Sequence, residues 1–228
     1  MRIQRLRLLT KELEKLQAFY TRILELPLLE SSKDAFTVSV GASCLTFELT
    51  EHADEVPFYH FAFDIPENKM DEAIIWLRSK AVALNLLPNH SYKAYFHTWD
   101  ATSIYFDDPA GNIVEFIARH SLNNEIDISF TSSTFVNISE IGLVVNDVTR
   151  TKTLMKNNLG LDGYKDSDPS FAAVGDEDGL LIVSAPKRVW LGSEKKAAVF
   201  RTEVTIEGTD KGTGTIDLDP YPYKIIVN

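Results

Sequence analysis

The chain has 228 residues, of which 44% are hydrophobic and 25% charged, a composition that is typical of a globular protein and excludes a disordered or fibrous one. Asp and Glu number 33 against 23 Lys and Arg, so the formal net charge is −10. Because this charge repels phosphate backbones and anionic bilayers, we expect neither a nucleic acid nor a membrane as partner.

The longest apolar runs, such as residues 179–183, fall far short of the roughly 20 residues that span a membrane. Charges at Lys11 and Glu12 interrupt the start of the chain, unlike a signal peptide, and we expect a cytoplasmic protein. Cys44 is the only cysteine, which excludes an internal disulfide and a cysteine-based zinc site. Its position in a predicted strand favours a half-buried structural thiol.

A repeat organises the first half of each predicted domain. Residues 8–26 and 143–161 align without a gap at an offset of 135, and each copy contains a strand end, an acidic turn and an amphipathic helix. Glu12 and Asp147 stand where the two helices begin, as the helix dipole favours. The pattern therefore predicts the same supersecondary unit twice.

Strand-like runs complete these units and add two more. The first helix is followed by strands at 35–40 and 44–49, and the second copy by strands at 171–174 and 180–184. Another unit has a strand at 58–64, a helix at 68–80 and strands at 103–106 and 112–117. The last has strands at 200–207, 215–218 and 223–227 but no room for a helix. Residues 119–134 are polar and predict a linker.

Several of these stretches together resemble the vicinal oxygen chelate superfamily, which includes glyoxalase I, the extradiol dioxygenases and the bleomycin resistance proteins. They are the helix ending in Phe19-Tyr20, then residues 47–50, 59–63 and 105–116. The most specific element is the Asp-Pro-Ala-Gly-Asn turn at 108–112, followed three residues later by Glu115.

The resemblance implies an α+β fold in which paired βαβββ modules form open curved barrels. Residues 1–120 then form one domain of two modules. Residues 135–228 form a degenerate second domain, with one module and a truncated one that lacks its helix.

The resemblance also implies a divalent metal held by the first and last strands of the modules. In the first domain the ligand positions fall on Arg5, Glu48, His60 and Glu115. The last three can bind Fe, Mn, Zn or Ni, whereas a guanidinium offers no lone pair. We therefore expect a metal on Glu48, His60 and Glu115, with Arg5 holding an anionic substrate.

A metal-free cavity is an equally consistent alternative, in which Arg5 replaces the charge of the metal and the protein sequesters a small molecule as bleomycin resistance proteins do. His60 would then be a structural histidine, and Glu48 could lie on the exterior. A third possibility is a vestigial pocket in a fold that serves only for association.

In the second domain the matching positions are Glu140, Val183, approximately Glu203, and Ile226. Because two of these are apolar and none is histidine, we expect that domain to support or close the pocket without a comparable metal site.

Residues 92–100 are dense in aromatic side chains. The resemblance places this segment at the substrate cavity, with Tyr95 and Trp99 as contacts together with Tyr105, and with His97 as an acid or base beside Glu115. An edge strand that packs its aromatics on the core is the alternative.

The predicted function is a small-molecule enzyme resembling glyoxalase or ring-cleaving dioxygenases, either a lyase or isomerase or a dioxygenase. The metal would chelate two neighbouring oxygens of the substrate as a Lewis acid. The predicted partners are a small-molecule substrate and, as a possibility, a second copy of the chain.

Overall fold

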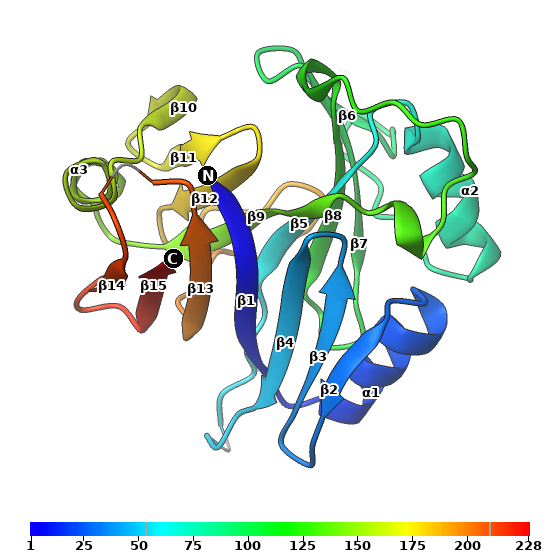
Figure 1. Ribbon diagram of the computed structural model, residues 1–228, viewed down its shortest axis with the longest axis horizontal. Helices are drawn as coiled ribbons and strands as arrows, with labels where there is room; N and C mark the ends of the chain where they lie inside the picture. Colours follow the sequence, from blue (N-terminus) through cyan, green and yellow to red (C-terminus); the bar gives the residue numbers. More distant parts are fainter. Residues whose placement is uncertain (53, 210) are drawn as a thin grey trace.

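The computed structural model describes residues 1–52, 54–209 and 211–228, and of residue 166 the backbone alone. Within these residues, fifteen strands form one continuous, strongly curved sheet, and the α-helices lie at its two ends (Figure 1). The α+β class is as predicted. No helix among the described residues is both long and apolar enough to cross a membrane.

The order of elements confirms the four predicted modules. The first contains β1 (Arg2–Thr10), α1 (Leu13–Ala18) with a π-helical turn (Phe19–Ile23), β2 (Leu28–Ser31), β3 (Ala35–Val40) and β4 (Ser43–Leu49). The second contains β5 (His60–Ile65), α2 (Met70–Ser79), β6 (Ala94–Phe96), β7 (Ala101–Asp107) and β8 (Ile113–Arg119). The third contains β9 (Asn137–Val144), α3 (Val148–Leu159), β10 (Gly163–Asp168), β11 (Phe171–Asp176) and β12 (Gly179–Ser184). The fourth has β13 (Thr202–Glu207), β14 (Gly214–Asp217) and β15 (Tyr223–Val227), with no helix in its described residues.

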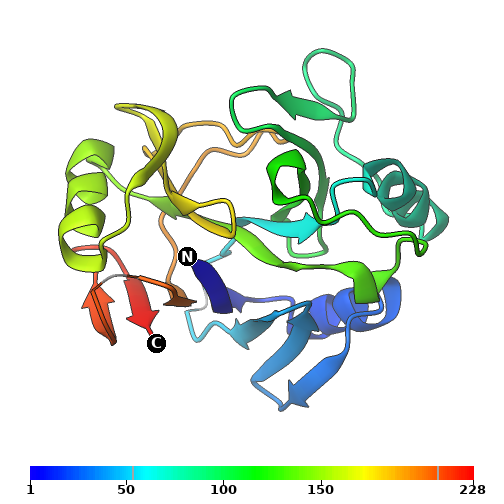
Figure 2. The same cartoon turned by 45° about the horizontal axis from the view of Figure 1, so that its top comes forward.

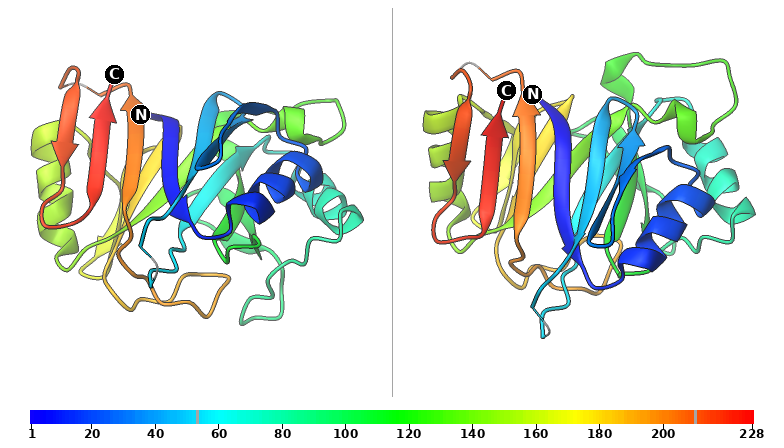
Figure 3. Two further views of the ribbon diagram at one scale, coloured as in Figure 1. Left: turned by 90° about the horizontal axis from the view of Figure 1, so that it is seen from below. Right: turned by 60° about the horizontal axis from the view of Figure 1, so that its bottom comes forward.

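The modules pair across the two halves of the sequence. β5 pairs antiparallel with β9, and β1 pairs antiparallel with β13. We call the second and third modules the central barrel, and the first and fourth modules the terminal barrel. Figure 3 shows the strands of the terminal barrel side by side, from β14 through β15, β13 and β1 to β4 and β3. The expectation that residues 1–120 close a barrel of their own is therefore corrected.

Alternation along the strands of the central barrel separates two faces. On β5, Phe61 and Phe63 point into the main core, where the rings of Phe63 and Phe116 lie 6.1 Å apart. The intervening residues, including His60 on β5 and Glu115 on β8, point to the opposite, concave face. Both strands are buried along their full length.

The two motifs that carried the family resemblance meet in space. The carboxylate of Asp108 accepts hydrogen bonds from the backbone N–H groups of Ala110 and Asn112 and from the hydroxyl of Tyr20, the last at 2.8 Å. Tyr20 lies in the π-helical turn of the first module, so this bond ties that module to the β7–β8 turn. The motif thereby fixes the start of β8, which begins at Ile113, two residues before Glu115.

The segment predicted as a polar linker is largely exposed but is anchored by a few buried side chains. Arg119 is the last residue of β8 and is fully buried, and Phe130 and Phe135 pack against Trp76 and Phe116. The polar residues around these apolar anchors hid them in the sequence, because an isolated Phe gives no periodic signal.

Candidate functional site

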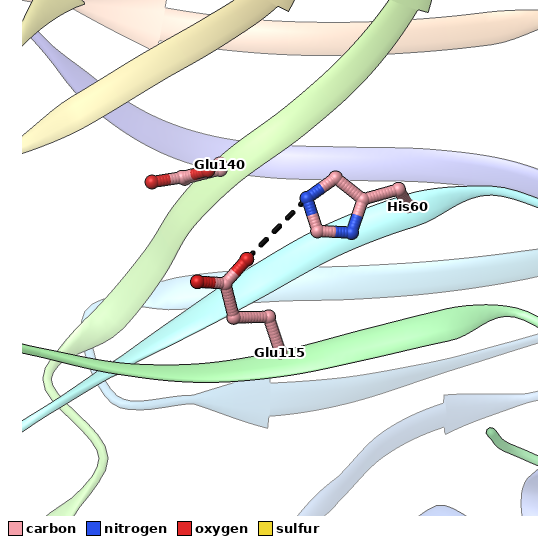
Figure 4. Close-up of side chains that lie close together, drawn as sticks. All are labelled: His60, Glu115 and Glu140. Atoms are coloured by element: carbon pink, nitrogen blue, oxygen red, sulfur yellow. Dashed lines mark ion pairs between the residues drawn. The ribbon is translucent and has the colours of Figure 1, made fainter. Parts of the chain in front are cut away.

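Three polar side chains converge on the concave face of the central barrel. His60 on β5, Glu115 on β8 and Glu140 on β9 each offer a nitrogen or oxygen atom, and these atoms lie within 4.8 Å of one another (Figure 4). All three residues are buried, and Nε2 of His60 is 3.4 Å from Oε2 of Glu115. The cluster is therefore assembled from both halves of the sequence.

The strand register explains why the two carboxylates meet. Ala62 on β5 lies opposite Glu115 on one neighbouring strand and opposite Glu140 on the other, so the carboxylates flank β5 at the same level. Since alanine adds only a methyl group between them, the longer glutamate side chains reach across it to the imidazole.

The same register identifies a fourth, apolar position. In the second module, Ala62 follows His60 by two positions and lies opposite Glu115 on β8. In the third module, Gly142 follows Glu140 by two positions and lies opposite Ile182 on β12. Ile182 is therefore the counterpart of Glu115. Ile182 lines the concave cavity, whereas Val183, the expected position, faces the main core. The central barrel thus offers three potential ligands and one apolar side chain.

A cavity of about 200 Å³ lies over the cluster. Aromatic side chains form much of its wall, with Phe96, Trp99 and Tyr105 from the second module and Phe171 and Trp190 from the second half of the chain. The loop between β12 and β13 closes one side, and Figure 2 shows this loop, in orange, near β6. The site is therefore a small, mostly apolar pocket with a few convergent polar groups, the usual form of a ligand site.

His60 is arranged as a neutral ligand. Burial lowers its pKa to about 4, so the imidazole is uncharged at neutral pH. Its Nδ1 lies 3.3 Å from the carbonyl oxygen of Ile113, which assigns the proton to Nδ1 and leaves the lone pair of Nε2 on the side of Glu115. The ring of Trp190 covers the imidazole at 4.9 Å between centroids and holds its orientation.

The two carboxylates have different partners. Glu140 accepts a hydrogen bond of 2.5 Å from Nη2 of the fully buried Arg119, which also bonds the hydroxyl of Ser139. Glu115 faces the neutral imidazole instead. Burial, together with the charge of Glu140, raises the pKa of Glu115, and burial likewise raises that of Glu140. A cation between the two carboxylates would remove their mutual repulsion.

This donor set fits a divalent metal ion. One imidazole nitrogen and two carboxylates suit Mn, Fe, Ni or Zn, and three protein ligands leave positions for a substrate. Arg119 would orient Glu140 through its hydrogen bond, because groups that hydrogen-bond to metal ligands commonly hold those ligands in position. The geometry of the side chains is thus compatible with the cofactor that the sequence suggests.

The structure brings four of the sequence-predicted site residues together and leaves four outside. His60, Glu115, Trp99 and Tyr105 all line the cavity. The residues outside it are Tyr95, which is 61% exposed, His97, which lies exposed in the turn after β6, and Arg5 and Glu48, which lie in the terminal barrel. Alternation on β6 explains the first, since Phe96 faces the cavity and its neighbour faces solvent.

Glu48 has a cationic partner of its own in the terminal barrel. Arg7 on β1 lies 3.4 Å from Glu48 on β4 and 3.7 Å from Glu203 on β13. Arg5, the residue expected to neutralise carboxylates, is exposed and lies two positions before Arg7 on β1. Arg7 therefore supplies the charge that the sequence assigned to Arg5.

Glu140 and Arg119 are the site residues that sequence reasoning missed. Glu140 occupies the ligand position of its module, so the repeat did contain the signal, but the module was paired with the wrong neighbour. The second half was expected to support or close the pocket, and it also brings the carboxylate of Glu140 to the cluster. Arg119 shares its strand face with Glu115 and Ile117, and that alternation was the available signal.

Comparison with known proteins identifies the family and the fold. Residues 2–116 match the family model of the Glyoxalase/Bleomycin resistance protein/Dioxygenase superfamily, which covers half of the chain. The chain therefore belongs to that superfamily. None of the curated proteins compared with it is a significant match.

Solved structures of the same fold cover nearly the whole chain. A Bacillus subtilis protein provisionally described as a dioxygenase superimposes with a TM-score of 0.66 over 100% of this chain and 85% of its own, at 15% identity. Glyoxalase I from Zea mays gives a TM-score of 0.58 over 99% of this chain and 91% of its own, at 14% identity. A mutant of that enzyme gives 0.61 over 99% and 92%, also at 14%. At these identities the likeness shows the fold alone.

Proposed function

We propose that the protein is a small-molecule enzyme of this superfamily that uses a divalent metal ion held by His60, Glu115 and Glu140. The observation that carries the proposal is the cluster itself, in which one neutral imidazole and two carboxylates from three strands lie within 4.8 Å at the base of a cavity. Mn, Fe, Ni and Zn are all compatible with such ligands. When bound, the ion would act as a Lewis acid toward neighbouring oxygens of a substrate.

The contacts of the two carboxylates suggest separate tasks. Glu140 is bonded to Arg119, so its charge is fixed and it is suited to ligation alone. Glu115 has no such guanidinium bond and faces the cavity, so it is the carboxylate suited to exchange a proton with the substrate. Both chemistries for which structural neighbours are named, glyoxalase and dioxygenase, are consistent with this division.

The remaining cavity residues bind and shield. Burial, followed by the charge of Glu115, raises the pKa of Tyr105 well above its usual value, so its phenol keeps the proton and can donate a hydrogen bond to a substrate oxygen. Trp99 and Trp190 provide flat apolar surfaces that exclude water from the reacting groups. The proposed substrate is therefore a small molecule with an apolar portion beside its oxygens.

The metal-free alternative lacks support from the arrangement of charges. It requires a fixed cation between the cavity carboxylates, and Arg5 was to supply it, but Arg5 lies in the terminal barrel. Arg119 contacts Glu140 and does not form an ion pair with Glu115 among the described residues. A homodimer remains a prediction, as does a cytoplasmic location.

Metal analysis tests the proposal. The protein is incubated with Mn²⁺, Fe²⁺, Ni²⁺ or Zn²⁺, desalted, and analysed for metal by mass spectrometry. We expect one equivalent per chain, and at least about tenfold weaker binding in Glu140→Gln and His60→Gln, because each loses one ligand.

Glu48→Gln is the matched control, because it neutralises a carboxylate of the other barrel and leaves all three proposed ligands in place. It should bind metal like the wild type. The proposal is wrong if the wild-type protein stays free of all four metals, or if Glu48→Gln loses metal as strongly as Glu140→Gln.

A further inference from the structure

Arg188 brings a positive charge to the cavity wall. It lies in the loop between β12 and β13 and lines the cavity together with His60 and Trp190. Its carbonyl oxygen accepts a hydrogen bond of 2.7 Å from the backbone N–H of Ala197, which fixes its place in the loop. Its guanidinium lies over the ring of Phe171, 4.6 Å from the centroid. The side chain is therefore held by stacking, with its N–H groups left for other partners.

The guanidinium of Arg188 forms no ion pair with any side chain that the structure describes. Asp168 acts on it electrostatically but only from a distance, and Tyr105 and His60 are titratable neighbours on the cavity side. Arg119 is a contrast on the same face, since its charge is already committed to Glu140. A half-buried guanidinium without an anionic partner is unfavourable, so Arg188 is available to an anionic ligand.

The charges that face the cavity point to an anionic ligand. The charged side chains that line the cavity are Glu115, Glu140 and Arg188, and Arg119 is paired with Glu140 beside it. A divalent ion on the carboxylates would make the site positive overall. A ligand that brings negative charge of its own would then restore neutrality, and Arg188 is the cation free to receive it.

We propose that Arg188 is a specificity-determining residue that binds the carboxylate of a small, flat substrate. This deepens the proposed function and rests on it only in taking this cavity as the substrate site. A guanidinium presents two parallel N–H groups that match the two oxygens of a carboxylate. The cavity of about 200 Å³ is of the size that holds a single six-membered ring, since a cavity of about 150 Å³ accommodates benzene.

Benzoate and benzamide test this assignment, because they share one shape and differ in charge. Binding of each is measured by calorimetry on metal-free protein and again on protein loaded with Mn²⁺. We expect the wild type to bind benzoate about tenfold or more tightly than benzamide in both forms, the ratio that separates a charge-assisted hydrogen bond from a neutral one. In metal-free Arg188→Gln, the ratio of the affinity for benzoate to the affinity for benzamide should fall toward one.

Lys187→Gln is the matched control, because it removes a positive charge from the adjacent, exposed residue and leaves the cavity wall intact. It should keep the wild-type ratio. Equal binding of the two probes to the wild type, failure of both to bind at millimolar concentration, or an equal loss of preference in Lys187→Gln would each overturn the assignment. Since the metal-free measurement does not require the ion, loss of metal binding and loss of charge selectivity are separate results.

Discussion

Asp64 is a buried acid at the concave face that has no hydrogen-bond partner for either carboxylate oxygen among the described residues. It follows His60 and Ala62 on the same face of β5 and is 1% exposed. Burial raises its pKa from 3.8 to about 7, only partly opposed by the charge of Arg119. The folded protein therefore binds a proton at Asp64 under conditions in which the unfolded chain has released it.

This shift makes the stability of the protein depend on pH in a defined direction. Where the folded state binds more protons, the free energy of unfolding falls as pH rises. The stabilising contribution of Asp64 to the free energy of unfolding is fully present below about pH 4. It is lost as pH rises to about 7, and the loss is on the order of 4 kcal/mol. Asp64→Asn removes the titration.

We expect Asp64→Asn to gain stability relative to the wild type as pH rises from about 4 to about 8, measured by urea unfolding. Asp34→Asn, at an exposed position, is the control and should show no comparable trend. A difference between Asp64→Asn and the wild type that stays constant across this range would contradict the assignment.

At the scale of elements, the loop between β12 and β13 is fitted closely against the wall of the cavity. Gly192 in this loop has φ of +71°, and a Cβ atom there would lie 2.4 Å from Cγ of the buried Tyr105. Gly142 on β9 has a similar role, since a Cβ atom there would lie 2.7 Å from Cη2 of Trp190. Both glycines therefore allow the loop to approach His60 and close the pocket.

Gly192→Ala tests the contact between the loop and the wall. Gly212→Ala is the matched control, because Gly212 has nearly the same φ, +74°, with no atom of the described residues within 4 Å of the added Cβ. Both variants incur the cost of the left-handed backbone, about 1 kcal/mol. We expect Gly192→Ala to lose roughly 1–3 kcal/mol more than the control in urea unfolding, because Tyr105 has no room to move. Equal losses would show that the loop does not pack as described.

At the scale of the whole molecule, the two barrels differ in the side chain that lies beside their carboxylates. In the terminal barrel, Leu9 follows Arg7 by two positions and lies opposite Glu48. In the central barrel, Ala62 follows His60 by two positions and lies opposite Glu115. Arg7 and His60 are therefore at equivalent positions. Arg7 contacts both Glu48 and Glu203 and neutralises them with a covalently attached cation. The central barrel places an imidazole at this point, so Glu115 has no guanidinium partner among the described residues, while Glu140 is paired with Arg119.

This comparison predicts that Arg7→His gains a metal site. The variant would place an imidazole beside Glu48 and Glu203, so we expect metal stoichiometry to rise from about one to about two equivalents per chain at saturating Ni²⁺ or Zn²⁺. In Arg5→His, the control, Arg7 still occupies the position between the carboxylates, so stoichiometry should not change. A second equivalent in the control, or none in Arg7→His, would contradict the proposed likeness of the two barrels.

The sequence by itself determined the modules and four of the side chains that face the cavity from the second module, which are His60, Trp99, Tyr105 and Glu115. The helical period located α1, α2 and α3, because this signal depends on neighbours within one segment, and the family resemblance indicated His60 and Glu115 as site residues. The turn at 108–112 was recognised from its own residues. The repeat also marked Glu140 as a ligand position.

Only the tertiary structure decided which modules share a barrel. Alternation specifies which face of a strand is buried but not which strand lies beside it, and an antiparallel pair can join segments at any separation in sequence. The pairing of β5 with β9 brought Glu140 and Arg119 to the site and left Glu48 with Arg7. The chemistry of the cavity therefore depends on a contact between the two halves of the chain that no local pattern encodes.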